Sequence, residues 1–317
     1  MHKKNKSNKI EITRVYEAPI EMVWDAWTDD RQVSQWWGPR GFTLTTHSKD
    51  LKNGGHWHYT MHGPDGVDYE NTTQYLEFKK CQRLVYDHGG NKERPPLFRV
   101  TATFSDLGGK TKLHMSMAFE TPEAAEESKK FIKQAGGTGT WDRLAEYLEE
   151  KQTGEDVFII ARSFEAPIDL AFEMWTNAKH FPQWMGPTGS TMKFIDCHIQ
   201  PGKTSFYEMQ FEGNTMYGKF EYLEISRPTR LVYKQWFSTK DGGLSRHPMA
   251  PTWPAFMLTT VTFSEEGADQ TRIVIKWEIF GEATQEERAM FHSAKAGMQG
   301  GWTGSFDKLE EFLTSLH

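Results

Sequence analysis

ITRVYEAPIEMVWDAWTDDRQVSQWWGP at residues 12–39 and IARSFEAPIDLAFEMWTNAKHFPQWMGP at residues 160–187 are two versions of one stretch of sequence. At a constant offset of 148, 12 of the 28 positions are identical. Most of the other positions keep their chemistry, as where Tyr16 corresponds to Phe164. This offset has the length of a domain, whereas solenoid repeats have periods of roughly 20–50 residues. The sequence therefore predicts two copies of one globular domain.

The similarity continues beyond this opening and then shifts in register. RLVY at 83–86 matches RLVY at 230–233 at an offset of 147, and TFS at 103–105 matches TFS at 262–264 at 159. The second copy therefore contains an insertion near residues 237–255, which is rich in Gly and Pro and is typical of a long loop. Long loops in compact domains are often functional. A drifted hairpin explains the insertion equally well, so both interpretations stay open.

Composition limits the classes of protein to consider. A chain of 317 residues with 25% charged and 37% hydrophobic residues suits two soluble domains of about 150 residues each. No apolar run approaches the roughly 18 residues that a membrane span requires. The net charge is −6 and the basic residues are scattered, which argues against a nucleic acid as partner.

The ends and the cysteines indicate a cytoplasmic protein. MHKKNKSNK at residues 1–9 is basic but has no apolar core, so we expect a disordered tail and not a secretory signal. Cys81 and Cys197 occupy non-equivalent positions in the two copies. A shared disulfide is therefore not expected, which suits a reducing compartment.

Local patterns predict the same element order in each copy. A strand, expected at 10–17 and 157–165, precedes a proline in the first turn of a helix, and a second short helix ends at the Gly-Pro of WWGP or WMGP. About six strands follow, and a helix with an apolar stripe closes each copy. Strands followed by a segregated helix predict an α+β fold. We expect domains at 10–150 and 156–317, joined by a short polar linker at about 149–156.

Glycines interrupt both closing helices. They are Gly136, Gly137 and Gly139 in the first copy, and Gly297, Gly300, Gly301 and Gly304 in the second. Each glycine inside a helix costs roughly 1 kcal/mol relative to alanine. We interpret the clusters as a kink that also leaves free volume beside the helix; a plain break between two shorter helices is the alternative.

The segment HWHYTMH at 56–62 is the strongest candidate for chemistry. On a strand its three histidines share one face, and Trp57, Tyr59 and Met61 share the other. Histidines at i and i+2 suit zinc, but the second copy has none at these positions. Tyr59 and Met61 are repeated, as Tyr207 and Met209, so the aromatic face is predicted to point inward. A solvated histidine face is the preferred interpretation, and no metal or cofactor is predicted.

The sequence contains no shared catalytic set. Neither a G-x-S-x-G elbow nor a phosphate-binding glycine loop placed after a strand occurs. His114 of the first copy corresponds to Val274 of the second, and Glu208 replaces Thr60. No catalytic residue is nominated, and whether the protein is an enzyme is left open, with the balance against it.

Together these motifs resemble a known family. The order of strand, EAPI, a helix ending in Trp-Thr and then Q-W-x-G-P is similar to the Hsp90-ATPase-activator-homologue-1-like domain of the START-like, Bet v 1-like (SRPBCC) superfamily. GGHWHYTM, the RLVY strand and Gly301-Trp302 before the last helical stripe add to the resemblance. The first copy departs at the Gly-Trp position, where Gly137 replaces the tryptophan, so its pocket is expected to be more open at that end.

The resemblance implies a helix-grip fold in each copy. A curved antiparallel sheet would wrap the long C-terminal helix, with two short helices closing one end and a cavity between sheet and helix. The side chains expected to approach that cavity are Trp57, Tyr59, Met61, Met115, Met117 and Trp141 in the first copy, and Tyr207, Met209, Trp277, Met298 and Trp302 in the second. Ordinary core packing is the alternative for each residue singly.

Three functions follow as expectations. The first is binding of a hydrophobic small molecule, lipid-like or aromatic, in one or both cavities. The second is a cyclase or hydratase acting on such a ligand in the same cavity. An Hsp90 co-chaperone is the least favoured, because the eukaryotic activator joins this domain to a different N-terminal domain and this chain repeats it. The short linker also suits an intramolecular pseudo-dimer of the two halves.

Overall fold

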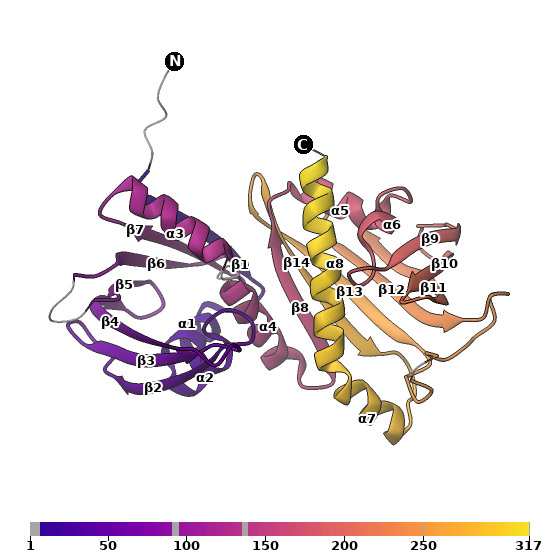
Figure 1. Ribbon diagram of the computed structural model, residues 1–317, viewed down its shortest axis with the longest axis horizontal. Helices are drawn as coiled ribbons and strands as arrows, with labels where there is room; N and C mark the ends of the chain where they lie inside the picture. Colours follow the sequence, from indigo (N-terminus) through magenta and orange to yellow (C-terminus); the bar gives the residue numbers. More distant parts are fainter. Residues whose placement is uncertain (1–6, 91–94, 135–138, 249, 317) are drawn as a thin grey trace, which may run out of the picture. The chain divides into compact units, whose positions relative to one another are not determined.

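The computed structural model describes residues 7–90, 95–134, 139–248 and 250–316. The chain divides into two compact units at Gln152 and Thr153 (Figure 1). The predicted linker is partly helical, because α4 continues to Thr153 and only residues 154–156 separate it from the next strand. The basic residues 1–6 of the expected tail lie outside the described residues, and Lys9 is the first residue of β1.

The first domain consists of β1 (Lys9–Tyr16), α1 (Ile20–Thr28), α2 (Asp30–Trp36), β2 (Thr43–Lys49), β3 (His56–His62), β4 (Asp68–Lys79), β5 (Arg83–His88), β6 (Phe98–Asp106), β7 (Thr111–Ala118), α3 (Pro122–Gln134) and α4 (Gly139–Thr153). The second consists of β8 (Val157–Phe164), α5 (Ile168–Thr176), α6 (Phe181–Trp184), β9 (Thr191–Asp196), β10 (Thr204–Phe211), β11 (Asn214–Ser226), β12 (Arg230–Ser238), β13 (Met257–Gly267), β14 (Gln270–Ile279), α7 (Gln285–Ser293) and α8 (Lys295–Ser315).

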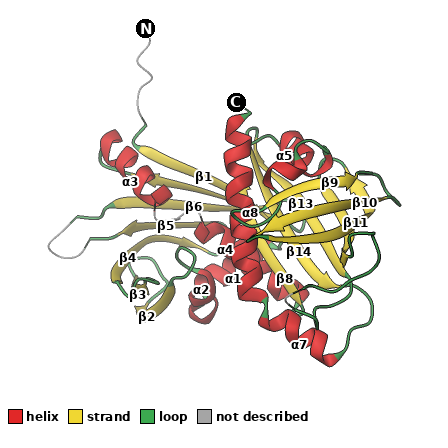
Figure 2. Cartoon of the chain, turned by 45° about the vertical axis from the view of Figure 1, so that its right-hand side comes forward, coloured by secondary structure: helices red, strands yellow, loops and turns green. Residues whose placement is uncertain are grey.

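Each domain contains a seven-stranded antiparallel sheet. The strand orders are β1-β7-β6-β5-β4-β3-β2 and β8-β14-β13-β12-β11-β10-β9, so the two sheets have the same topology. In the second domain α8 lies against the curved sheet (Figures 1 and 2). The predicted α+β helix-grip fold is confirmed in both copies. Even a local irregularity is shared, since the fourth strand of each sheet has a bulge between Tyr75 and Glu77 or between Tyr222 and Glu224.

Hydrogen bonds explain why the opening motif is repeated. The carbonyl of Ala18 accepts from the hydroxyl of Thr111 at 2.7 Å, and Ala166 accepts from Thr271 at 2.8 Å. Both alanines are completely buried, so an unpaired carbonyl there would be costly. The following prolines occupy the N-cap positions of α1 and α5, one residue before the first turn predicted for them.

The tryptophan of Q-W-x-G-P fastens the two short helices of each domain together. Trp36 donates its indole N–H to the carbonyl of Ala26 at 2.9 Å, and Trp184 donates to Met174 at 3.1 Å. Both rings are fully buried. A buried indole needs such an acceptor, which explains a tryptophan at this position in both copies.

A basic side chain holds the turn after these helices against the closing helix. Arg143 on α4 directs Nη1 at the carbonyls of Gly38 and Pro39, both at 2.9 Å, and donates from Nη2 to the carbonyl of Gln35 at the end of α2 at 3.1 Å. At the equivalent position on α8, Lys308 donates to the carbonyls of Gly186 at 3.3 Å and Ser190 at 3.1 Å. The turn exposes its carbonyls because its glycine has a positive φ, 96° in the first domain and 105° in the second.

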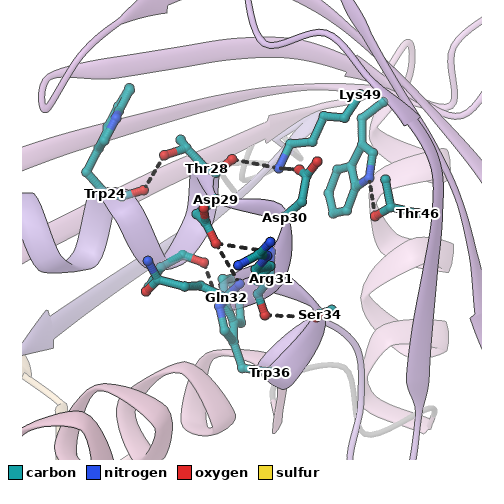
Figure 3. A network of polar contacts seen from close by, with 12 residues as sticks. Trp24, Thr28, Asp29, Asp30, Arg31, Gln32, Ser34, Trp36, Thr46 and Lys49 are labelled. Atoms are coloured by element: carbon teal, nitrogen blue, oxygen red, sulfur yellow. Dashed lines mark hydrogen bonds and ion pairs between the residues drawn. The ribbon is translucent and has the colours of Figure 1, made fainter.

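In the first domain a polar network surrounds the start of α2 (Figure 3). Lys49 at the end of β2 donates to the carbonyl of Thr28 and pairs with Asp30, both at 2.9 Å, while its side chain is only 3% exposed. Burial lowers the pKa of Lys49, and Asp30 opposes that effect. Asp29 caps α2 by accepting from two backbone N–H groups. The network ties the edge strand to the helical turn of this domain.

The closing helices differ between the domains. In the second, α7 and α8 meet at Ala294 and α8 then continues unbroken through all four glycines. A Cβ added at Gly297 or Gly301 would meet open space beside the cavity, whereas Gly300 is exposed to solvent. The helix boundary precedes the glycines, and α8 is one helix across the cluster where a kink was expected. In the first domain Gly136 and Gly137 lie outside the described residues. Among the described helices none combines the length and apolarity needed to cross a bilayer.

Candidate ligand cavity

The second domain contains a cavity of about 550 Å³ between its sheet and the closing helices. Residues of β10, β11, β12, β13 and β14 form one side of the cavity, and α7 and α8 form another. The turn at 185–187 and the insertion loop between β12 and β13 complete the wall. This volume lies in the range of sites that enclose small organic molecules.

The wall is apolar, aromatic and rich in methionine. Its methionines are Met185, Met209, Met216, Met257, Met290 and Met298, and its tryptophans are Trp236, Trp253, Trp277 and Trp302. Methionine is flexible and polarisable, and it packs well against aromatic rings. Such a wall can adjust to the shape of an apolar or flat aromatic guest.

The five residues nominated from the sequence in this domain all line the cavity. Tyr207 and Met209 approach from β10, Trp277 from β14, and Met298 and Trp302 from α8. Trp277 and Trp302 face each other edge-on with ring centroids 5.6 Å apart. Their role in binding a ligand stays a prediction. The five side chains that were expected to approach a cavity do line one.

Glycine on α8 keeps the cavity open. Gly297 and Gly301, one helical turn apart, both line the cavity and have no atom within 4 Å of an added Cβ. By contrast, a Cβ on Gly304 would lie 2.8 Å from the backbone nitrogen of Thr188. The same helix therefore uses glycine for two purposes, empty space at one place and close approach at another.

The insertion loop supplies a wall that sequence reasoning did not nominate. His247, Ala250, Trp253 and Pro254 of this loop line the cavity. Arg246 fixes the loop by donating to the carbonyl of Trp253 at 2.7 Å and by pairing with Glu287 of α7 at 2.6 Å. The Gly- and Pro-rich composition of the insertion indicated a long loop, but it did not show which residues of the loop point into the cavity.

Glu287 has a second role at the start of α7. It forms a capping box with Thr284, accepting from the Thr284 backbone N–H at 2.9 Å. Thr284 in return accepts from the Glu287 backbone N–H at 3.2 Å. These hydrogen bonds and Arg246 lower the pKa of Glu287. One carboxylate therefore joins the helix start to the cavity loop.

The polar groups of the wall are few and largely neutral. Burial raises the pKa of Tyr207 above its usual range and lowers the pKa of His247. The indole N–H groups of Trp277 and Trp302 are buried and have no hydrogen-bond partner among the described residues. The wall therefore offers donors that the described protein groups leave unused, in a setting that disfavours charge.

In the first domain aromatic rings pack closely around the residue that corresponds to Met185 of the cavity wall. Trp37 corresponds to the cavity residue Met185, and its ring lies 5.3 Å from Trp57, 6.4 Å from Tyr59 and 6.2 Å from Trp141. The nominated residues here are placed as follows: Trp57, Tyr59, Met115, Met117 and Trp141 are buried, and Met61 is partly buried. The expectation of a more open pocket at Gly137 lies outside the described residues.

The two domains also place one stacked ring differently. In the first, Trp57 of β3 stacks on Tyr59 at 4.0 Å and faces Thr73 of β4. In the second, the residue equivalent to Trp57 is Ser205, and it faces Phe220, which stacks on Tyr207 at 4.6 Å. The large and small members of this cross-strand pair have been exchanged between the strands. Each sheet therefore keeps one ring on the repeated tyrosine.

The histidine face of β3 forms hydrogen bonds along the sheet. His62 pairs with Asp68 at 2.6 Å, His56 contacts the Ser48 hydroxyl at 3.0 Å, and the ring of His58 lies 4.9 Å from that of His47. Within the described residues no group of three metal-ligating side chains is arranged to hold an ion. Cys81 and Cys197 are free thiols.

The comparisons with known proteins follow the two-domain division. The family model described as "Activator of Hsp90 ATPase homolog 1-like protein" matches residues 17–149 and again residues 165–314. No curated protein matches the chain in a sequence comparison.

Solved structures resemble one domain or the whole chain. A protein from Nitrosomonas europaea is 20% identical over 45% of this chain and 96% of its own, with a TM-score of 0.42. One from Staphylococcus epidermidis is 25% identical over 48% and 95%, with a TM-score of 0.41. The di-domain ARO/CYC BexL from the BE-7585A biosynthetic pathway is 12% identical over 96% and 98%, with a TM-score of 0.39. On the two family matches, this chain belongs to the activator of Hsp90 ATPase homolog 1-like family and carries two copies of its domain.

Proposed function

We propose that this protein binds an apolar small molecule in the cavity of its second domain. The observation that carries the proposal is a cavity of about 550 Å³ lined mainly by methionine and tryptophan side chains. An apolar guest that enters the cavity removes its own surface and that of the wall from water, which favours binding. The adaptable wall suits ligands of more than one shape.

We favour the second domain over the first as the binding site. In the first domain the ring of Trp37 contacts Trp57, Tyr59 and Trp141 at the place where the second domain has Met185. Gly297 and Gly301 further widen the cavity of the second domain. The proposal therefore expects one ligand per chain.

A cyclase or hydratase receives less support than simple binding. Such a reaction needs a proton donor and a proton acceptor positioned at the ligand. The described wall offers Tyr207, His247 and Gln235 but no carboxylate or cationic side chain. Burial also moves the pKa of Tyr207 away from neutral pH, which makes it a weak acid there.

The experiment is titration with N-phenyl-1-naphthylamine, an apolar dye whose fluorescence rises on burial. We expect the intact protein to bind one dye molecule. Met185→Trp, which imports the residue of the first domain, should abolish that binding, and Gly301→Leu should do the same by filling the cavity from α8. Gly300→Ala lies on the same helix away from the cavity and serves as the control.

Two results would contradict the proposal. One is an absence of dye binding by the intact protein, and the other is binding that persists unchanged in both folded cavity-filling variants. Circular dichroism and thermal melting establish that the variants fold. Native mass spectrometry of freshly purified protein complements the titration, because a retained molecule would appear as added mass on intact protein.

A further inference from the structure

Charge is absent from the described wall of the cavity. None of the described residues that line it is a lysine, arginine, aspartate or glutamate. This holds for the exposed part of the wall as well, where Ser293 and Gly297 lie. In the whole sequence 25% of the residues are charged, so a wall without these residue types stands out.

Two cationic side chains that hold segments of the cavity wall are bound to other protein groups. Arg246 pairs with Glu287 at 2.6 Å and donates to the carbonyl of Trp253. Lys308 donates to the carbonyls of Gly186 and Ser190. These cations act within the fold, and recruiting them for a ligand would break the contacts that hold the loop and the turn.

Lys295 is similarly occupied. It lies beside the exposed rim at the start of α8 and donates to the carbonyls of Glu155 and Val157. His292, also near the rim, pairs with Asp156 at 3.0 Å. Lys295 and His292 therefore both have partners within the second domain.

We propose that the ligand is electrically neutral and aromatic: the cavity accepts uncharged aromatic molecules and rejects those that carry an ionised carboxylate, sulfonate or ammonium. This inference rests on the proposed function and narrows its ligand class. Moving an ion from water into an apolar site is strongly unfavourable unless a counter-charge meets it. The described wall provides none, whereas its indole and thioether groups favour flat rings.

The titratable groups of the wall agree with a neutral site. Desolvation keeps His247 uncharged by lowering its pKa, and it keeps Tyr207 protonated by raising its pKa. Gln235 contributes a neutral amide from β12. These groups can form hydrogen bonds with an uncharged ligand oxygen or hydroxyl without supplying a countercharge.

A matched pair of probes separates neutral from charged ligands. N-phenyl-1-naphthylamine and 8-anilino-1-naphthalenesulfonate share one aromatic skeleton and differ by the sulfonate. Only the fluorescence that Met185→Trp or Gly301→Leu removes is assigned to the cavity. For that signal we expect the sulfonate to bind at least tenfold more weakly, which corresponds to about 1.4 kcal/mol.

Gln235→Lys then tests the cause of the selectivity. It adds a cation to the wall with little change in side-chain length, so the difference in affinity between the neutral probe and the sulfonate should become smaller. Gln235→Met changes the same side chain without adding charge and should leave the difference in affinity between the two probes unchanged.

The outcomes distinguish this inference from the proposed function. Cavity binding of the sulfonate within tenfold of the neutral probe overturns the neutral-ligand inference and leaves the cavity as a binding site. If Gln235→Lys leaves the difference in affinity between the two probes unchanged, the electrostatic explanation is overturned. If neither probe gives a signal that the filled variants remove, the proposed function fails and the inference with it.

Discussion

At the scale of single residues, Arg143 and Lys308 perform one task with different side chains. Each leaves the closing helix and donates to carbonyls of the turn that follows the second short helix. Arg143 donates from two nitrogens of its planar guanidinium, Nη1 toward the turn and Nη2 toward Gln35, whereas Lys308 has only its Nζ. The two domains thus show how far this contact can vary without loss of the turn.

We expect Arg143→Met to lower the free energy of unfolding of the first domain by about 2–4 kcal/mol, because several partly buried carbonyls lose their donor. Arg143→Lys should recover part of the loss, since Lys308 fills the same position in the second domain. Urea denaturation followed by fluorescence measures both. Equal stability of Arg143→Met and the unaltered protein would show that the turn holds without this contact.

His88 makes the stability of the first domain depend on pH. It stacks on Phe98 with ring centroids 4.8 Å apart, and burial lowers its pKa to about 4. In the unfolded chain its pKa returns to about 6.5. Below pH 6.5 the unfolded state therefore binds the proton first, and folding is weakened progressively until about pH 4, by up to about 3 kcal/mol.

His88→Phe retains a ring beside Phe98 and removes the titration. The difference in unfolding free energy between this variant and the unaltered protein should grow in favour of the variant as pH falls from 6.5 to 4. Urea melts at several pH values measure that difference, and carboxylates that titrate in the same range cancel from it. If the unfolding free energies of the two proteins change with pH in parallel, protonation of His88 does not destabilise the folded domain.

At the scale of elements, α8 shows that glycines of one helix obey different constraints. Gly300 is exposed and a Cβ there meets nothing, whereas a Cβ on Gly304 would lie 2.6 Å from the Thr188 hydroxyl and 2.8 Å from its backbone nitrogen. The equivalent Gly139 of the first domain would meet only the Arg40 side chain, at 3.8 Å. Sequence alone shows the four glycines as one cluster and does not separate these roles.

We expect substitutions at these two glycines to have opposite signs. Gly300→Ala should stabilise the second domain by about 0.5–1 kcal/mol, because alanine favours the helix and fits the space. Gly304→Ala should destabilise it by about 1–3 kcal/mol, because the backbone of the turn must move. Thermal melting of the two single variants gives both signs, and stabilisation by Gly304→Ala would refute the close contact.

At the scale of the whole molecule, repetition made the fold readable from the sequence. The two occurrences of the opening motif indicated the domain division, and alternation with turn signals predicted the strands that the structure contains. Strand alternation and the repeat predicted the inward face of β10, whereas the cavity residues of β14 and α8 were expected from the family resemblance. These features are local, so a single chain carries enough information to predict them.

The features that were missed depend on contacts between distant segments. Trp37 packs against Trp57, Tyr59 and Trp141, whereas Met185 at the same place in the motif lines the cavity, and the motif does not show this difference. The inward placement of Trp253 depends on the Arg246–Glu287 pair, which joins segments 41 residues apart. Strand and helix periodicity does not predict such contacts between segments that are distant in the sequence.

The exchanged pair on the third and fourth strands has a consequence for recombination between the two copies. A crossover that joined β3 of the first domain to β11 of the second would set Trp57 against Phe220, two large rings at one buried position. The reciprocal product would set Ser205 against Thr73 and leave a hole. Viable hybrids should therefore inherit both strands from a single parent, so that this hairpin passes between copies as one indivisible unit.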